Sequence, residues 1–255
     1  MDLHGIFPPV TTPFDDRDEV DYRAFAQNVQ HWMTTQLHGL VVLGSNGEAP
    51  YIDDDEAYRL VATAREHVPG NRRLIVGAGH ESTRRTIAAV GRAAQAGADL
   101  VLVRTPSYFK SQMTADVFIR HYTAVADASR VPVLLYDVPA FTGVTLPVAA
   151  VATLAEHPNI IGAKESAPDI GLVSDFVAAT PRQPDPPGHR SPRHVADLAR
   201  RDPRGGAGAR VRVALRRARA RARAAGVARG LERESFERNV QRTGAIPEKP
   251  EQPFQ

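Results

Sequence analysis

The chain has 255 residues, of which 42% are hydrophobic, and its formal net charge is +3. This length and composition suit one large domain, and no apolar run reaches the roughly 18 residues that a membrane-spanning helix needs. The sequence contains no cysteine, which excludes disulfides, thiolate catalysis and cysteine metal sites. The start, MDLHGIFPPV, lacks the basic and apolar regions of a secretion signal, so we expect a cytoplasmic protein.

Charge is distributed unevenly along the chain. Residues 1–180 contain 14 Lys+Arg and 21 Asp+Glu, a balance of −7, whereas residues 181–255 contain 18 and 8, a balance of +10. The second segment is also rich in arginine, proline and alanine. We therefore expect two parts, a folded region over 1–180 and a tail over 181–255.

Apolar runs typical of β-strands alternate with stretches of helical period throughout residues 1–180. The runs recur about every 30 residues, which is the length of a βα unit. The sequence therefore predicts six βα units. The expected strands are 5–14, 39–45, 73–79, 99–106, 131–139 and 159–166.

Three of the intervening stretches carry signals for the ends of helices. Asp21 is expected to cap a helix whose apolar stripe follows it, and Asp53 and Glu56 have the spacing of a capping box. A third stripe ends at Gly97, the residue type that commonly terminates helices. The first stripe consists of Phe25, Val29, Trp32, Met33 and Leu37.

Parallel strands joined by helices form either an open doubly wound sheet or a closed (β/α)8 barrel. The glycine patterns of the nucleotide-binding open sheets, GxGxxG after the first strand and GxxxxGK[ST], are absent. Polar residues instead follow several different strands, which is typical of a barrel whose site is built from many strand ends. We predict an α/β fold of the TIM-barrel type, truncated after six βα units.

Three motifs carry candidate chemistry, and each has a purely structural alternative. Lys164 lies near the end of the apolar run IIGAKES, where a strand buried on both faces would desolvate it, although a lysine can also extend to solvent. GSNGE at 44–48 can point backbone amides at an anion or form an ordinary βα turn. Tyr136, in YDVPAFTG at 136–143, can transfer protons or merely pack.

Together the three motifs favour imine chemistry. Desolvation lowers the pKa of a lysine, and the neutral amine can attack a carbonyl to form a Schiff base. A nearby phenol can move protons, and an amide-rich turn can hold the carboxylate of a 2-oxo acid.

GSNGE, YDVPAFTG and GAKES, in this order and spacing, resemble the pyruvate-dependent Schiff-base aldolases, the family of dihydrodipicolinate synthase and N-acetylneuraminate lyase. The resemblance covers about residues 5–180. Within the family, these motifs and LPVAAVATLAEHPNIIGAKES are most similar to 4-hydroxy-2-oxoglutarate aldolase.

The resemblance implies roles for matching residues. Lys164 would form the Schiff base with pyruvate, Tyr136 would transfer protons, and Ser45 would take part in the proton relay. Tyr108, in TPSYF, would reach into a neighbouring subunit's site, which implies a homo-oligomer, either a dimer or a tetramer. Neither a metal nor a dissociable cofactor is expected. The implied substrate-binding residues are Ser45, Asn46, Gly47, Phe141 and Thr142.

The resemblance implies a carbon–carbon lyase that splits a 2-oxo acid and releases pyruvate. The synthase motif YxVPxRTG has an arginine that holds the second substrate's carboxylate, and this chain has Phe141 there. A synthase or an N-acetylneuraminate lyase relative is the alternative enzyme. The alternative from another class is a non-catalytic protein whose basic tail binds nucleic acid, a partner that we do not expect.

The tail over 181–255 shows no seventh or eighth strand pattern. It is interpretable as a basic arm for nucleic acid, as a solvated helix with proline-rich flanks, or as the product of a reading-frame shift in a GC-rich gene, which we favour. If the tail supplies no strands, the barrel stays open and the catalytic residues would be present without full activity.

Overall fold

The structure is a computed structural model that describes residues 3, 5–167 and 169–180. The tail over 181–255, and with it each of its three interpretations, lies outside the described residues. The division of the chain at residue 180 therefore stays a prediction.

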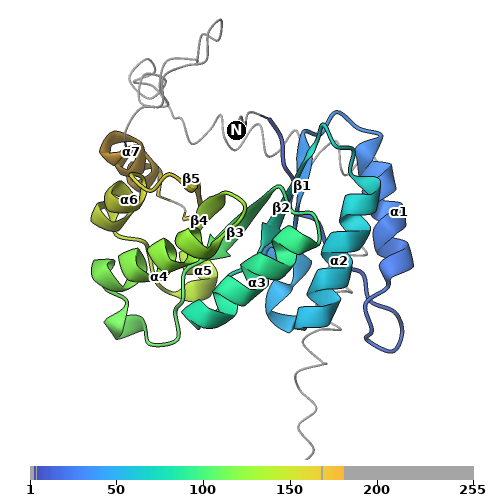
Figure 1. Cartoon of the computed structure of the whole chain (residues 1–255), viewed down its shortest axis with the longest axis horizontal. Coiled ribbons are helices and arrows are strands. Elements are labelled where there is room, and N and C mark those ends of the chain that lie inside the picture. Colours follow the sequence, from blue (N-terminus) through green and yellow to red (C-terminus); the bar gives the residue numbers. More distant parts are fainter. Residues whose placement is uncertain (1–2, 4, 168, 181–255) are drawn as a thin grey trace, which may run out of the picture.

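Five parallel strands form the sheet, in the same order as in the sequence (Figure 1). They are β1 (Gly39–Val42), β2 (Arg73–Gly77), β3 (Leu100–Arg104), β4 (Val133–Asp137) and β5 (Ile160–Glu165). All five lie within predicted strands, and each pair is joined by a helical crossover, as the βα spacing predicts.

The prediction of a full strand over 5–14 is wrong. This segment runs beside β1, and its pairing with β1 is limited to an isolated bridge between Pro9 and Val41. The amide of Val10 donates to the Val41 carbonyl (3.0 Å), and the Val41 amide donates to the Pro8 carbonyl (2.9 Å). Proline has no amide hydrogen to donate, so Pro8 and Pro9 limit the ladder to these contacts.

α1 precedes β1, the other helices follow the strands, and together they cover the outer face of the sheet (Figure 1). The longer ones are α1 (Tyr22–Met33), α2 (Asp54–His67), α3 (Thr83–Gln95), α4 (Ala115–Ala128), α6 (Val148–Leu154) and α7 (Ile170–Ala179). Short turns of helix are η1 (Ser45–Gly47), η2 (Ala49–Tyr51), η3 (Lys110–Gln112) and α5 (Pro139–Thr142).

The predicted helix ends are largely confirmed. Asp21 caps α1 by accepting from the Ala24 amide, and Asp53 and Glu56 form both hydrogen bonds of a capping box at α2. Gly97 follows the C-cap of α3 with a φ of +101°, a conformation that favours glycine. Leu37, predicted as part of the first stripe, lies beyond the end of α1.

Side chains alternate between two apolar layers. The larger layer fills the space between the sheet and the helices, and the smaller one lines the inner face of the sheet. The buried inner residues are Val41, Ile75, Leu100, Leu102, Tyr136 and Val138. This arrangement is that of a (β/α) barrel wall.

β5 departs from the prediction of a strand covered on both faces. Gly162 and Ala163 are exposed, and Lys164 is only half-buried. Among the residues that the structure describes, β5 pairs with β4 on one side and with no strand on the other. The shielding of Lys164 therefore comes from the β4 side.

Within the described part of the chain, none of the helices combines the length and apolar character needed to cross a bilayer.

Two carboxyl groups meet at the ends of β4 and β5. Asp137 and Glu165 are register partners, and Asp137 is 0% exposed. Neither oxygen of the Asp137 carboxyl has a hydrogen-bond partner of good geometry among the described residues. Burial, and then the neighbouring Glu165 charge, raise the pKa of Asp137 from 3.8 to about 7.

This pair predicts a pH-dependent stability. A carboxyl whose pKa is higher in the folded state than in the unfolded state favours folding below pH 3.8, and this contribution is lost as the pH rises through about 7. Asp137→Asn, which mimics the neutral acid, should therefore raise the free energy of unfolding at pH 8, by up to about 4 kcal/mol. Denaturant titrations at pH 8 and at pH 4 test this. A gain that is equal at both pH values would contradict the assignment.

Candidate active site

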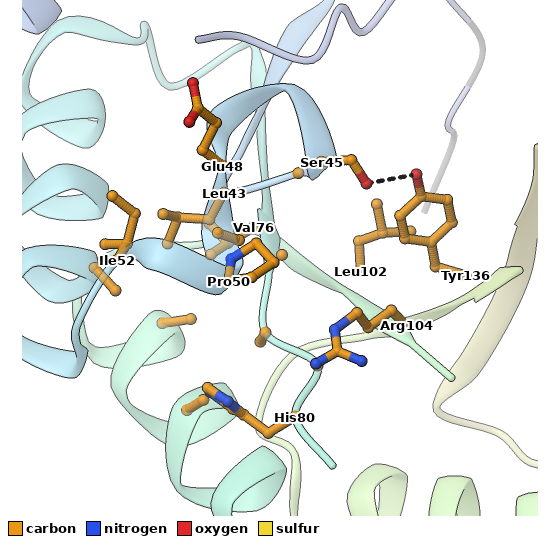
Figure 2. A pocket seen from close by; sticks show the side chains of 18 of the residues that line it. Leu43, Ser45, Glu48, Pro50, Ile52, Val76, His80, Leu102, Arg104 and Tyr136 are labelled. Carbon is orange, nitrogen blue, oxygen red and sulfur yellow. Dashed lines mark hydrogen bonds between the residues drawn. The ribbon is translucent and has the colours of Figure 1, made fainter. Parts of the chain in front are cut away.

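The carboxyl ends of the strands open into a cavity of about 870 Å³. Residues that follow β1, β2, β3 and β4 line it, together with side chains from α2 and α3. In parallel barrels this edge of the sheet is where loops from several strands converge on one site. Figure 2 shows Ser45, His80, Arg104 and Tyr136 around this space.

Tyr136 contacts two other predicted site residues, Lys164 through its ring and Ser45 through its hydroxyl. Lys164 and Tyr136 are register partners on β5 and β4, and Lys164 Nζ is 4.3 Å from the centre of the Tyr136 ring. Ser45 Oγ is 3.2 Å from the buried Tyr136 hydroxyl (Figure 2). The ring thus shields one side of the amine, and the hydroxyl is hydrogen-bonded to the loop after β1. Lys164 is not itself among the cavity-lining residues, and it adjoins the cavity through Tyr136, which lines it.

The GSNGE loop forms the tight turn that its two glycines predict. Residues 45–47 make one turn of 3-10 helix, and Thr12 Oγ1 donates to the Gly47 carbonyl (2.8 Å). A Cβ atom on Gly47 would lie 3.0 Å from the Val10 carbonyl oxygen, so the turn packs closely on the amino-terminal segment. Asn46 is exposed and lines the cavity, as does Ser45.

The remaining predicted residues differ in position. Tyr108 is 77% exposed, packs edge-on against Phe109, and is not among the cavity-lining residues. Phe141 is equally exposed but lines the cavity. Thr142 also lines it, although its hydroxyl is 3.2 Å from the Val138 carbonyl and 3.1 Å from that of Val144. Tyr108 therefore does not join the other site residues within this chain.

The sequence motifs did not identify Arg104 and Glu81. Arg104 Nη1 donates to Glu81 Oε1 (2.8 Å), and Glu81 Oε2 accepts from the amides of Ser107 (2.7 Å) and Tyr108 (2.9 Å). Partial burial alone would raise the pKa of Glu81, but hydrogen bonds from Arg104 and both amides outweigh it and lower the pKa below its usual value. Arg104 is the last residue of β3 and Glu81 follows β2, and this position at strand ends is the available signal in the sequence.

The described residues contain no group of three or more histidine, aspartate or glutamate side chains arranged to hold a metal ion. The cavity and the adjoining Lys164 bring together an amine, a phenol, hydroxyls, an imidazole, carboxylates and paired guanidinium groups.

A model of the dihydrodipicolinate synthetase family matches residues 2–183. A 4-hydroxy-tetrahydrodipicolinate synthase from Exiguobacterium is 37% identical over 177 residues, which are 69% of this chain and 60% of that protein. An uncharacterized DapA-like lyase from Halobacterium salinarum is 38% identical over 181 residues, 71% of this chain and 59% of that protein. The chain thus spans about 60% of the length of these relatives.

Solved structures give the same result. A prophage protein of the dihydrodipicolinic acid synthase family from E. coli K12, in complex with pyruvate, is 33% identical with a TM-score of 0.66, over 70% of this chain and 60% of that one. Dihydrodipicolinate synthase from Thermotoga maritima is 33% identical with a TM-score of 0.65, over 69% and 59%. The predicted barrel fold is confirmed, and the chain belongs to the dihydrodipicolinate synthetase family.

Proposed function

We propose that this site forms a Schiff base between Lys164 and pyruvate, or another small 2-oxo acid, and makes or breaks a carbon–carbon bond next to the imine. The observation that carries the proposal is the contact of Lys164 Nζ with the Tyr136 ring, at 4.3 Å, and of the Tyr136 hydroxyl with Ser45, at 3.2 Å. An amine, a phenol and a second hydroxyl in contact provide both a nucleophile and a path for protons.

The reaction uses only groups of this chain and its substrates. Lys164 Nζ attacks the keto carbon, and the carbonyl oxygen leaves as water once protons have been transferred, which gives an imine. Tyr136, hydrogen-bonded to Ser45, is placed to move these protons. Loss of a proton from the carbon beside the imine gives an enamine, which attacks an aldehyde; the reverse sequence releases the aldehyde.

Ser45, Asn46 and Gly47 form the turn that would hold the carboxylate of the 2-oxo acid. The turn is anchored by Thr12, and Ser45 also contacts the catalytic phenol. A carboxylate bound there would bring the keto carbon toward Lys164. No dissociable cofactor enters this scheme.

The names of the relatives favour a 4-hydroxy-tetrahydrodipicolinate synthase, the enzyme that the sequence motifs placed second. The resemblance to 4-hydroxy-2-oxoglutarate aldolase stays a prediction, as does the N-acetylneuraminate lyase alternative. Assays for condensation of pyruvate with an acidic amino-aldehyde, and for pyruvate release from 4-hydroxy-2-oxoglutarate, distinguish the two leading activities.

A homo-oligomer is also part of the proposal, because the exposed Tyr108 ring is available to a neighbouring subunit. One similar structure is described as a monomeric dihydrodipicolinate synthase variant, so assembly must be measured for this chain. A cytoplasmic location and the nucleic-acid alternative for the tail stay predictions.

Trapping with borohydride tests the Schiff base directly. Incubation with pyruvate and borohydride should add a reduced pyruvyl group to Lys164, as read by peptide mass spectrometry, and Lys164→Ala should abolish the adduct. Lys110→Ala is the matched control, since Lys110 lies on η3 in the loop after β3, whereas Lys164 is the register partner of Tyr136. An unmodified Lys164 in folded protein would rule out the proposal.

The role of Tyr136 is tested by exchange of the pyruvate methyl protons with D₂O, followed by NMR. This exchange reports the enamine without requiring an aldehyde. Tyr136→Phe keeps the ring beside Lys164 but removes the hydroxyl, so the exchange rate should fall about 10²–10⁴-fold. Ser45→Ala should reduce it less. Exchange at the wild-type rate in Tyr136→Phe would show that another group moves the proton.

A further inference from the structure

We propose that Arg104 is a specificity-determining residue that binds a second carboxylate of the ligand, so that the site prefers dicarboxylic 2-oxo acids over those with a neutral far end. The inference deepens the proposed function, because it assigns the substrate class of the same cavity.

The strand register places Arg104 beside the catalytic pair. Arg104 on β3 is the register partner of Tyr136 on β4, which is in turn the partner of Lys164 on β5. Register partners on adjacent parallel strands point to the same face of a sheet. The three side chains therefore form one row on the inner face, with the Cα atoms of Arg104 and Lys164 about 10 Å apart.

The packing around Arg104 leaves room for its side chain in the cavity wall. A Cβ atom on Gly79 would lie 2.6 Å from both Cγ and the backbone nitrogen of Arg104, so only a glycine fits beside the stem. Arg104 lines the cavity with Gly79, and Figure 2 shows its guanidinium near His80, away from the Ser45 hydroxyl. A ligand bonded to Lys164 would thus meet Arg104 at its far end.

The guanidinium retains donors for a ligand. In the described part of the chain its hydrogen bonds all come from Nη1, which donates to Glu81 and to the Thr105 carbonyl. Nε and Nη2 remain, and an arginine can present two parallel N–H groups to a carboxylate. Glu81 is itself fixed by two backbone amides, so it orients the guanidinium.

The other basic groups of the cavity lie outside the row that Arg104, Tyr136 and Lys164 form. Arg85 and Arg92 extend from α3 and pair with carboxylates at the start of α2, Asp54 (3.4 Å) and Asp55 (2.6 Å). Burial, and then the Arg85 charge, lower the pKa of His80 below its usual value, which favours the neutral ring.

The residue at position 141 strengthens the assignment. Phe141 lines the same cavity with an apolar ring and offers no charge to a carboxylate. The cation for the second carboxylate of a dicarboxylate would therefore be Arg104 on β3.

A purely structural role for Arg104 is the competing account, since its contact with Glu81 also holds the loop that carries Ser107 and Tyr108. The two accounts predict different results. Loss of a structural contact would weaken all ligands alike, whereas loss of a carboxylate site weakens only those with a second carboxylate.

The test measures binding of glutarate and butyrate to the full chain by isothermal titration calorimetry. Neither probe has a keto group, so binding does not require a Schiff base. The wild type should bind glutarate at least about tenfold more tightly than butyrate. Arg104→Leu and Arg104→Gln should abolish this preference while butyrate affinity stays within about twofold. Arg85→Leu, the matched loss of another cavity arginine, should keep it.

The inference would be overturned if the wild type showed no preference for glutarate over butyrate. It would also be overturned if the preference persisted in an Arg104 variant that folds, or if Arg85→Leu lost the preference to the same extent. Borohydride trapping of pyruvate on the same samples separates this inference from the proposed function. Lys164 adducts without a glutarate preference would refute the Arg104 site alone. A glutarate preference without adducts would refute only the Schiff base.

Discussion

The parallel register of β3, β4 and β5 is the constraint on which the site depends. It brings Arg104, Tyr136 and Lys164, which are far apart in the sequence, to one level of the inner face. Their side chains share that face because successive residues of a strand alternate. A shift of one residue on β4 would turn Tyr136 toward the helices and leave Lys164 without its neighbour. The chemistry of the site is therefore a consequence of strand pairing.

The same alternation explains the acidic pair behind the site. Asp137 and Glu165 each follow a site residue in the sequence and are paired in the same register. The outer face is closed by helices, so Asp137 is buried there and its pKa rises. Tyr136 and Lys164 therefore lie on the inner face of the sheet, and the carboxyl groups of Asp137 and Glu165, which follow them in the sequence, lie on the outer face.

Much of this arrangement was predictable because its signals are local. Apolar runs indicated β1 to β5, and the Asp53–Glu56 spacing specified the start of α2. The extent of the first strand was not predictable from apolar content alone, because Pro8 and Pro9 cannot donate to a ladder. The half-buried state of Lys164 depends on its spatial neighbours rather than on its own segment. Arg104 and Glu81 were not predictable as site residues, because each contacts partners from another part of the sequence.

The most direct test of the account is a crystal structure of the full chain after reduction of its pyruvate complex with borohydride. The account predicts continuous density from Lys164 Nζ into the cavity, with the carboxylate at the Ser45–Asn46 turn and the Tyr136 hydroxyl beside the new bond. An adduct that points away from the cavity, or pyruvate bound elsewhere while Lys164 stays unmodified, would contradict it.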